Sequence, residues 1–244
     1  MNFERVPEHE ILRDSVREFF ARELPEERIR EMDRARRIPR EMWRRFAKLG
    51  WTGLSVPSEY GGSGADVSTG AVLCEELARR FPSLATDWLL ISMTARVLRE
   101  SGSAAQKAEL LPRLAAGDFL MSFGMSEPGG GTDVLALKTR AALQGQEWLV
   151  RGQKLYTSFA DDADAILVLC RTDPAEAKRS RGLSLILTPR NQPAVQVRRL
   201  ELMGQRAACT CEVFLDDARA PADALVGAQG SGWQTLLRTL DEER

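Results

Sequence analysis

The sequence predicts an α+β protein in which an all-helical domain precedes an antiparallel β-barrel or β-sandwich. Up to about residue 118, apolar residues recur with the period of roughly 3.6 that is typical of helices. After Phe119 the period falls to about two, as expected of short strands separated by turns. A helical pattern returns near Gly230. We therefore expect three parts: residues 1–118, residues 119–229, and residues 230–244 as the first turns of a C-terminal helical domain.

The first part is expected to contain at least five helices. A helix over residues 8–23 ends before Pro25, and a second begins at Pro39 and ends at Gly50. The Arg-rich stretch over residues 28–45 indicates a solvated helix face. The remaining helices are a segment capped by Ser68 that stops before Pro82, residues 84–100, and residues 104–116, which Pro112 should shorten or kink.

Strands are expected over six short segments of the second part: residues 135–142, 148–151, 165–171, 183–188, 195–200 and 212–215. Gln144-Gly145-Gln146 is typical of a hairpin turn between two of them.

The final helix starts at Trp233, and no Gly, Asn or Pro follows it. We therefore expect the chain to be a portion of a longer protein or a natural half.

Composition excludes several classes of function. The 34 basic and 35 acidic residues nearly cancel, so no nucleic-acid surface is indicated. The N-terminus has no signal-peptide pattern and no apolar run is long enough for a membrane helix, so we expect a cytoplasmic protein. Its single histidine, His9, disfavours a catalytic triad or a His-rich metal centre, so a cofactor would supply any catalytic chemistry.

The four cysteines are expected to be reduced and to bind no metal. Cys209 and Cys211 are two residues apart in a strand-like segment, so both thiols would point to the same face. A metal site would need further ligands, and the sequence offers no nearby histidine. The other two cysteines are Cys74 and Cys170.

The most informative stretch is MSFGMSEPGGGTD, residues 121–133. Its first residues alternate in polarity as a strand does, and Glu127-Pro128 then interrupts the pattern. Three glycines allow positive φ and a close approach to a ligand, and the following N–H groups can form a nest for a phosphate. From spacing alone, a glycine-rich hairpin turn fits equally well.

This stretch resembles the flavin-binding signature of the acyl-CoA dehydrogenase family, Tyr/Phe-x-x-Thr-Glu-Pro-x-x-Gly-Ser-Asp. Ser126 and Thr132 replace the Thr and the Ser of the signature, and each keeps a hydroxyl. Residues 152–158, GQKLYTS, resemble the family's Gly-x-Lys-x-Trp-Ile-Thr/Ser, and residues 202–206, LMGQR, resemble its Gly-x-Arg stretch. The three motifs occur in the family's order and spacing.

The resemblance implies an FAD-dependent enzyme that introduces an α,β double bond into an acyl-CoA or acyl-carrier-protein thioester. Ser126 is expected to bond the flavin ring, Ser158 to lie near its N5 atom, and Thr132 near the pyrophosphate and the substrate. An electron-transfer flavoprotein or another oxidant would take the electrons, in a homo-oligomer or with a partner chain that supplies the C-terminal helical domain. The residues expected to bind FAD are Phe123, Met125, Ser126, Gly131, Thr132, Tyr156, Thr157 and Ser158.

The catalytic base implied by the resemblance is a carboxylate. Glu243 matches the position that some family members use, while others take the base from the later helical domain, and a solvent-facing Glu243 fits equally well. Asp241 and Arg244 match positions that contact the substrate. Two alternatives remain open: a flavin monooxygenase or oxidase on the same scaffold, and a non-catalytic subunit. The length of the acyl group, the choice between CoA and a carrier protein, and the oligomeric state are also open.

Overall fold

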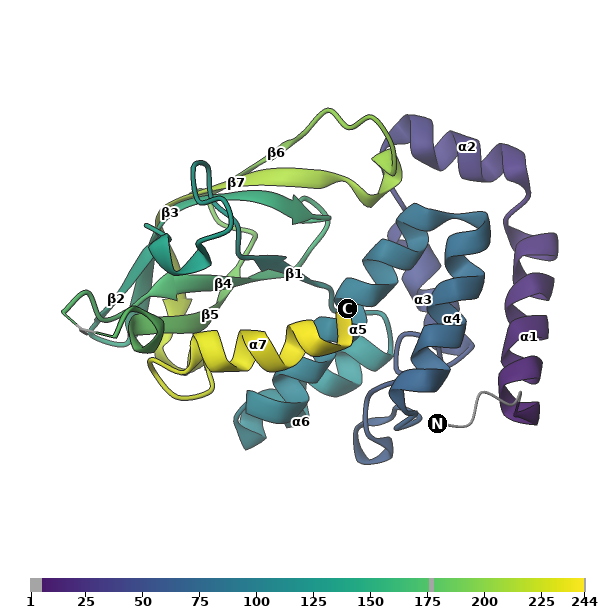
Figure 1. Ribbon diagram of the computed structural model, residues 1–244, viewed down its shortest axis with the longest axis horizontal. Helices are drawn as coiled ribbons and strands as arrows, with labels where there is room; N and C mark the ends of the chain where they lie inside the picture. The colour runs from purple at the N-terminus through teal and green to yellow at the C-terminus, as the bar shows by residue number, and fades with distance from the viewer. Residues whose placement is uncertain (1–5, 176–177, 244) are drawn as a thin grey trace.

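A computed structural model describes residues 6–175 and 178–243 of the chain, with side chains described as far as residue 239. The helices pack on one side of the molecule and the strands on the other, as Figure 1 shows, and α7 lies along α5 beneath the sheet. The helices are α1 Pro7–Glu23, α2 Glu26–Ala35, α3 Arg40–Lys48, α4 Val67–Arg80, α5 Pro82–Ser101, α6 Ala104–Ala115 and α7 Gly232–Glu243. The strands are β1 Met121–Gly124, β2 Arg140–Gln144, β3 Glu147–Ser158, β4 Ala165–Arg171, β5 Leu183–Pro189, β6 Val195–Arg199, β7 Thr210–Pro221 and β8 Leu225–Val226.

Helix ends follow the local sequence with two corrections. The carboxylate of Asp66 accepts the N–H of Thr69, so Asp66 caps α4 in place of the expected Ser68. Ser103 and Gln106 form a reciprocal capping box at the start of α6. The α6 helix continues through Pro112 to Ala115, so the expected shortening at this proline does not occur.

Aromatic side chains fill the core beneath α1 and α3. Phe46 is fully buried and meets three rings edge to face, at centroid distances of 5.4 Å to Phe19, 5.7 Å to Trp43 and 4.9 Å to Trp51. Such arrangements add to the free energy that burial of the rings already supplies. Phe46 therefore joins α1, α3 and the segment that follows α3.

The strands form one mixed sheet in the order β6-β7-β3-β2-β4-β5-β8, with β1 paired to β4. Most pairs are antiparallel, but β1 and β2 both run parallel to β4. Among the described strands, no pairing joins the end strands β6 and β8, so the sheet is open and the expected barrel was wrong. Closure would need long end strands, and β8 has only two residues.

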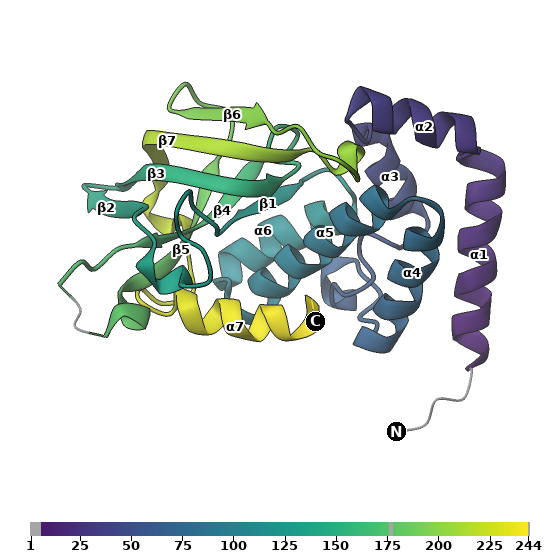
Figure 2. The ribbon, with the colours of Figure 1, turned by 45° about the horizontal axis from the view of Figure 1, so that its top comes forward.

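The helix α5 packs against other helices and against the sheet (Figure 2). Its residues Val97 and Leu98 share a buried cluster with Leu111 of α6 and with Met121 and Leu167 of the strands. The division at residue 118 stays a prediction. In the described part of the chain, no helix combines the length and apolar character that crossing a membrane requires, and the cytoplasmic location also stays a prediction.

We expect Phe46→Ala to lower the free energy of unfolding by about 3–5 kcal/mol, because it removes a fully buried ring and leaves a cavity. Urea unfolding followed by tryptophan fluorescence measures the change. Leu143→Ala is the control, since this side chain is 51% exposed and its loss should cost at most about 0.5 kcal/mol. Equal losses in the two variants would contradict the assignment of Phe46 to the core.

Candidate functional site

The first two sequence motifs lie side by side, on β1 with its extension and on β3. The Ser122 hydroxyl donates to the carbonyl oxygen of Ser158 at 2.7 Å. The Leu155 N–H donates to the carbonyl oxygen of Ser126 at 2.9 Å. These hydrogen bonds hold two segments that are distant in sequence as one surface, which faces α5.

A buried ion pair fixes the same junction. Lys154 is fully buried, and its Nζ lies 2.8 Å from Oε1 of Glu127 and 3.0 Å from the carbonyl oxygen of Met125. Glu127 also accepts the N–H groups of Lys138 at 2.6 Å and Thr139 at 2.9 Å. Glu127 precedes the glycine-rich turn, and its carboxylate binds Lys138 and Thr139, which follow the turn. It therefore holds the two ends of the turn together.

The pKa values of the pair follow from this geometry. Burial lowers the pKa of Lys154 by more than the charge of Glu127 raises it. Burial alone would raise the pKa of Glu127, but the ammonium group and the donated hydrogen bonds lower it overall. Glu127 is therefore a structural anion at neutral pH.

Tyr156 occupies a strained backbone position. Its φ is +58°, in the left-handed region that a bulky residue rarely adopts, and the register of β3 against β7 shifts between Lys154 and Thr157. This shift is a β-bulge, which re-aims side chains next to it. The Tyr156 side chain is 66% exposed as a result. Strain of this kind is commonly found at functional sites.

A small cavity of about 200 Å³ lies between this surface and α5. Most of its lining is apolar, and Thr86, Ser126 and Ser158 also line it. Five of the residues expected to bind the cofactor line it: Phe123, Met125, Ser126, Tyr156 and Ser158.

The other three residues expected to bind the cofactor lie elsewhere. Thr157 is buried in the sheet, and its hydroxyl has no hydrogen-bond partner among the described residues. Gly131 and Thr132 are exposed on the glycine-rich turn and line neither this cavity nor the larger one described next. Gly131 has a φ of +46°, in agreement with the expected turn.

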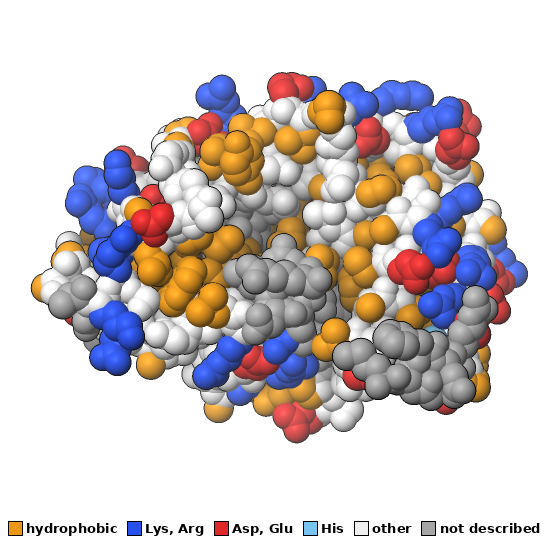
Figure 3. Space-filling model, viewed as in Figure 1, with side chains coloured by type: hydrophobic (Ala, Val, Ile, Leu, Met, Phe, Trp, Pro, Cys, Tyr) orange, Lys and Arg blue, Asp and Glu red, His pale blue; other side chains and the backbone are white. Residues whose placement is uncertain are grey.

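A larger cavity of about 660 Å³ adjoins the small one and shares Leu89 and Met93 with it. Its walls come from α4, α5 and the segment over residues 54–66, and Thr239 of α7 contributes at one end. Apolar surface predominates, with Leu54, Ala71 and Trp88 among the lining residues. In Figure 3 the surface between the strands and the helices is hollowed, and hydrophobic side chains are visible around the hollow.

The expected catalytic and substrate residues cannot all be placed. Glu243 is the last residue of α7, four positions after Thr239, and its side chain lies outside the described residues. The side chain of Asp241 is likewise not described, and Arg244 lies beyond the described residues. Their roles stay predictions.

Sequence reasoning missed the wall that α5 provides. Thr86, Leu89, Leu90 and Met93 line the small cavity, but their spacing is that of any helix with one buried face. Nothing in a single sequence separates an apolar residue that lines a cavity from one that fills a core. The Glu127–Lys154 pair, in contrast, joins two residues that the motifs themselves contain.

Comparison with known proteins places the motifs on β1 and β3 in one domain of a known family. Residues 6–118 match the profile of "Acyl-CoA dehydrogenase, N-terminal domain" and residues 122–218 that of "Acyl-CoA dehydrogenase, middle domain". Mitochondrial isovaleryl-CoA dehydrogenase of Pongo abelii is 30% identical over 237 residues, which are 96% of this chain and 56% of that protein. The chain thus spans little more than half the length of this relative.

Solved structures agree with the profiles. The acyl-CoA dehydrogenase from Geobacillus kaustophilus superposes with a TM-score of 0.94 at 31% identity, covering 100% of this chain and 64% of that one. A glutaryl-CoA dehydrogenase from Mycobacterium smegmatis, solved in complex with FADH2, superposes with a TM-score of 0.87 at 27% identity. That match covers 98% of this chain and 60% of the other.

We expect Lys154→Met to lower the free energy of unfolding at pH 7 by about 3–5 kcal/mol, because Glu127 is left buried and unpaired. The folded pKa of Glu127 is lowered, so its contribution to wild-type stability is complete above the unfolded value near pH 4.5 and is lost as the pH falls through the folded value. In Lys154→Met, burial without the ammonium group should raise the pKa of Glu127, so this variant regains stability as the pH falls toward the unfolded value, and the difference between the two proteins should shrink on acidification. Urea titrations at pH 7 and pH 4 measure it.

The double variant Glu127→Gln, Lys154→Met is the matched control. It removes both charges, so it should recover part of the stability at neutral pH. A double variant less stable than Lys154→Met alone would contradict the view that the unpaired carboxylate is the source of the loss.

Proposed function

Because the chain belongs to the acyl-CoA dehydrogenase family, we propose that it forms the flavin and acyl-binding surfaces of an FAD-dependent enzyme that introduces an α,β double bond into an acyl thioester. The observation that carries the proposal is the pair of adjoining cavities that share Leu89 and Met93 of α5. A dehydrogenase must hold the reacting carbons of its substrate against the flavin ring, and two cavities in contact allow this.

The residues of the small cavity suit the ring of a flavin. The apolar floor formed by Phe123 and Met125 matches the faces of a planar heteroaromatic ring, and the hydroxyls of Ser126 and Ser158 match its polar edge. Tyr156 is strained into a position beside this space, which supports a contact with the ring. A relative solved with FADH2 adds to this support.

When bound, FAD supplies the hydride acceptor of the reaction. The chain's own part is to orient the ring and to present donors where negative charge develops. Ser126 and Ser158 are such donors, and their backbones are fixed by the bonds between Ser126 and Leu155 and between Ser158 and Ser122. Donors held in place before the reaction need no reorganisation during it.

The larger cavity is assigned to the acyl group of the thioester. Its walls are mainly apolar, and burial of alkyl carbons there stabilises binding by about 0.8 kcal/mol per methylene. The small side chains of Gly70 and Ala71 leave room beside Trp88. Thr132, Asp241 and Arg244 are proposed to contact the remainder of the substrate, whether CoA or a carrier protein.

The proposed base is Glu243, which would remove the α proton of the substrate. It lies four positions beyond Thr239, which lines the acyl cavity, and positions four apart are neighbours on a helix, which supports the proposal. An electron-transfer flavoprotein or another oxidant would reoxidise the cofactor, and oligomerisation or a partner chain would complete the site.

Anaerobic titration of the FAD-loaded protein with saturated acyl-CoA thioesters of several chain lengths tests the function. We expect the flavin absorbance to bleach without oxygen. Thioester-independent oxygen uptake would instead favour a flavin oxidase or monooxygenase. A protein that takes up no FAD, alone or with a partner chain, would contradict the proposal.

We expect Glu243→Gln to abolish bleaching by acyl-CoA and to leave FAD affinity unchanged, because the amide cannot accept the α proton. Glu242→Gln is the matched control one residue away, and it should bleach at the wild-type rate. Stopped-flow absorbance measures both variants. Bleaching of Glu243→Gln at the wild-type rate would mean that the base is another carboxylate, in this chain or in a partner chain.

Ser126→Ala is expected to raise the dissociation constant of FAD about tenfold, the loss of one hydrogen bond at roughly 1.4 kcal/mol. Thr157→Val is the comparison, since its buried hydroxyl does not face the cavity and its removal should leave the affinity unchanged. Fluorescence titration with FAD gives both constants. A larger rise in the dissociation constant for Thr157→Val would indicate that Thr157 contacts FAD, as the sequence predicted.

A further inference from the structure

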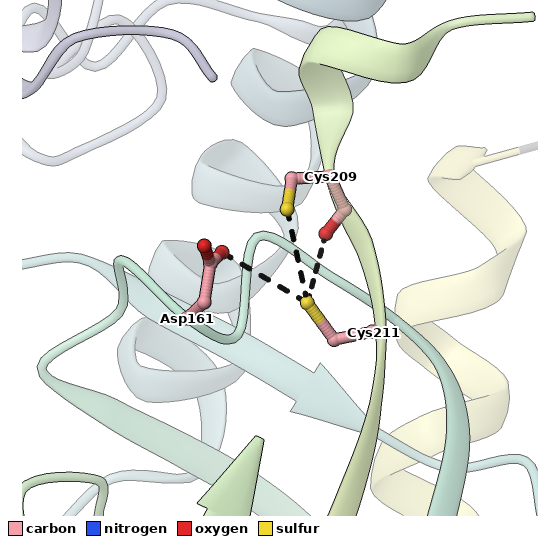
Figure 4. A group of neighbouring side chains, drawn as sticks. All are labelled: Asp161, Cys209 and Cys211. Carbon is pink, nitrogen blue, oxygen red and sulfur yellow. Dashed lines mark hydrogen bonds between the residues drawn. The ribbon is translucent and has the colours of Figure 1, made fainter. Parts of the chain in front are cut away.

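Two thiols and a carboxylate meet at the start of β7, away from both cavities. The Sγ atoms of Cys209 and Cys211 are 3.9 Å apart, and Sγ of Cys211 is 3.8 Å from Oδ1 of Asp161. The three ligand atoms all lie within 4.8 Å of one another. In Figure 4 Cys211 projects from β7, Cys209 from the segment just before it and Asp161 from a separate turn, and the three side chains face one another.

These distances are close to the edges of a tetrahedral zinc site. With Zn–S near 2.3 Å and Zn–O near 2.0 Å, tetrahedral angles place two sulfur atoms about 3.8 Å apart and sulfur and oxygen about 3.5 Å apart. The observed separations of 3.9 Å and 3.8 Å are close to these values, while the third pair, Sγ of Cys209 and the carboxylate of Asp161, lies within 4.8 Å and would have to draw closer around an ion. In place of the sequence-based expectation that no cysteine binds a metal, we propose that Cys209, Cys211 and Asp161 bind a zinc ion, with water in the fourth position.

The backbone holds the ligands in this arrangement before any ion binds. Cys209 has a φ of +47°, in the left-handed region, which turns the chain at the start of β7. Its carbonyl oxygen accepts the N–H of Phe159 at 3.0 Å, which ties the turn that carries Asp161 to the same segment. Burial of both thiols limits the rotamers they can adopt.

Arg199 orients the carboxylate. Its Nε donates to Oδ2 of Asp161 at 2.6 Å, so Oδ1 is left on the side of Cys211. Outer hydrogen bonds of this kind fix the direction of metal ligands in proteins. The Asp161 side chain is 13% exposed, which gives an ion and its water a route from solvent.

The surroundings also favour a positive charge. Asp87 of α5 is fully buried, and Oδ1 of its side chain has no hydrogen-bond partner among the described residues. Arg199 pairs with Asp161 and Arg37 with Asp162, so the acidic groups beside the two thiols already attract positive charge.

Binding requires no redox step. Two S–H bonds are replaced by two Zn–S bonds, and the two protons pass to solvent. The ion would act as a cross-link between the turn after β3 and the start of β7, because Asp161 and the cysteines lie on different segments. Cys211 pairs with Thr157, so this cross-link would lie behind the end of β3 that lines the small cavity.

Metal binding to the reduced, chelator-treated protein tests the proposal. Zn²⁺ affinity is measured by competition with a chromophoric chelator, and Co²⁺ serves as a spectroscopic probe. We expect one equivalent of Zn²⁺ to bind, and Co²⁺ to give the charge-transfer absorption of thiolate ligands. Zn²⁺ should also raise the thermal unfolding temperature, a readout that does not depend on FAD or on activity.

Cys209→Ser, Cys211→Ser and Asp161→Asn should each weaken Zn²⁺ binding about 100-fold or more, since loss of even an outer partner typically costs 10–100-fold. Cys74→Ala is the matched control: Cys74 is the one cysteine of the described chain that is not buried, so it is the natural competitor for added metal. Circular dichroism establishes that each variant is folded.

Three results would overturn the proposal. One is a reduced wild-type protein without the thiolate absorption of bound Co²⁺. Another is binding that Cys74→Ala abolishes and Cys211→Ser leaves intact. The third is a folded Asp161→Asn variant with wild-type Zn²⁺ affinity, which would remove the carboxylate from the site.

Discussion

The buried ion pair between Glu127 and Lys154 is the interaction on which the candidate site depends. A buried charge costs several kcal/mol in desolvation unless it is paired and hydrogen-bonded, so neither residue is tolerated here without the other. Glu127 meets this requirement with an ammonium group and two backbone N–H donors. The pair joins residues of the two motifs, so it fixes the position of one motif relative to the other.

That register explains how residues from segments distant in sequence come to line one cavity. The peptide groups of residues 125 and 126 bond to residues 154 and 155, so Ser126 is fixed relative to Tyr156 and Ser158. The opposite wall is α5, a helix of 20 residues that also shares buried clusters with α6 and the strands. Because α5 is packed on several sides, Leu89 and Met93 stay in position where they line both cavities.

Periodicity in the sequence predicted most of the elements, because a helix or a strand with one buried face carries a local signal. The strand over residues 165–171 and the hairpin at Gly145 are examples. The open sheet was not predictable in this way, since pairing of β1 and β2 with β4 depends on contacts between distant segments. Asp161 was missed for the same reason: its approach to Cys211 depends on the turn after β3, and nothing in its neighbours marks it.

The position of Thr157 shows how one inserted residue decides which side chains face the site. Lys154 pairs with Val213, and Thr157 pairs with Cys211, so three steps along β3 correspond to two along β7. Partners directly opposite each other share a face, and Val213 and Cys211 lie on the same face of β7 because they are two residues apart.

Lys154 and Thr157 therefore both point inward, although strict alternation would place them on opposite faces. The bulge absorbs the extra residue at Tyr156, whose positive φ is the local cost. Without it, Thr157 would face the cavity and Ser158 would be buried. A motif that reads Tyr-Thr-Ser in sequence thus presents its first and third residues to the cavity, and its middle residue to the sheet.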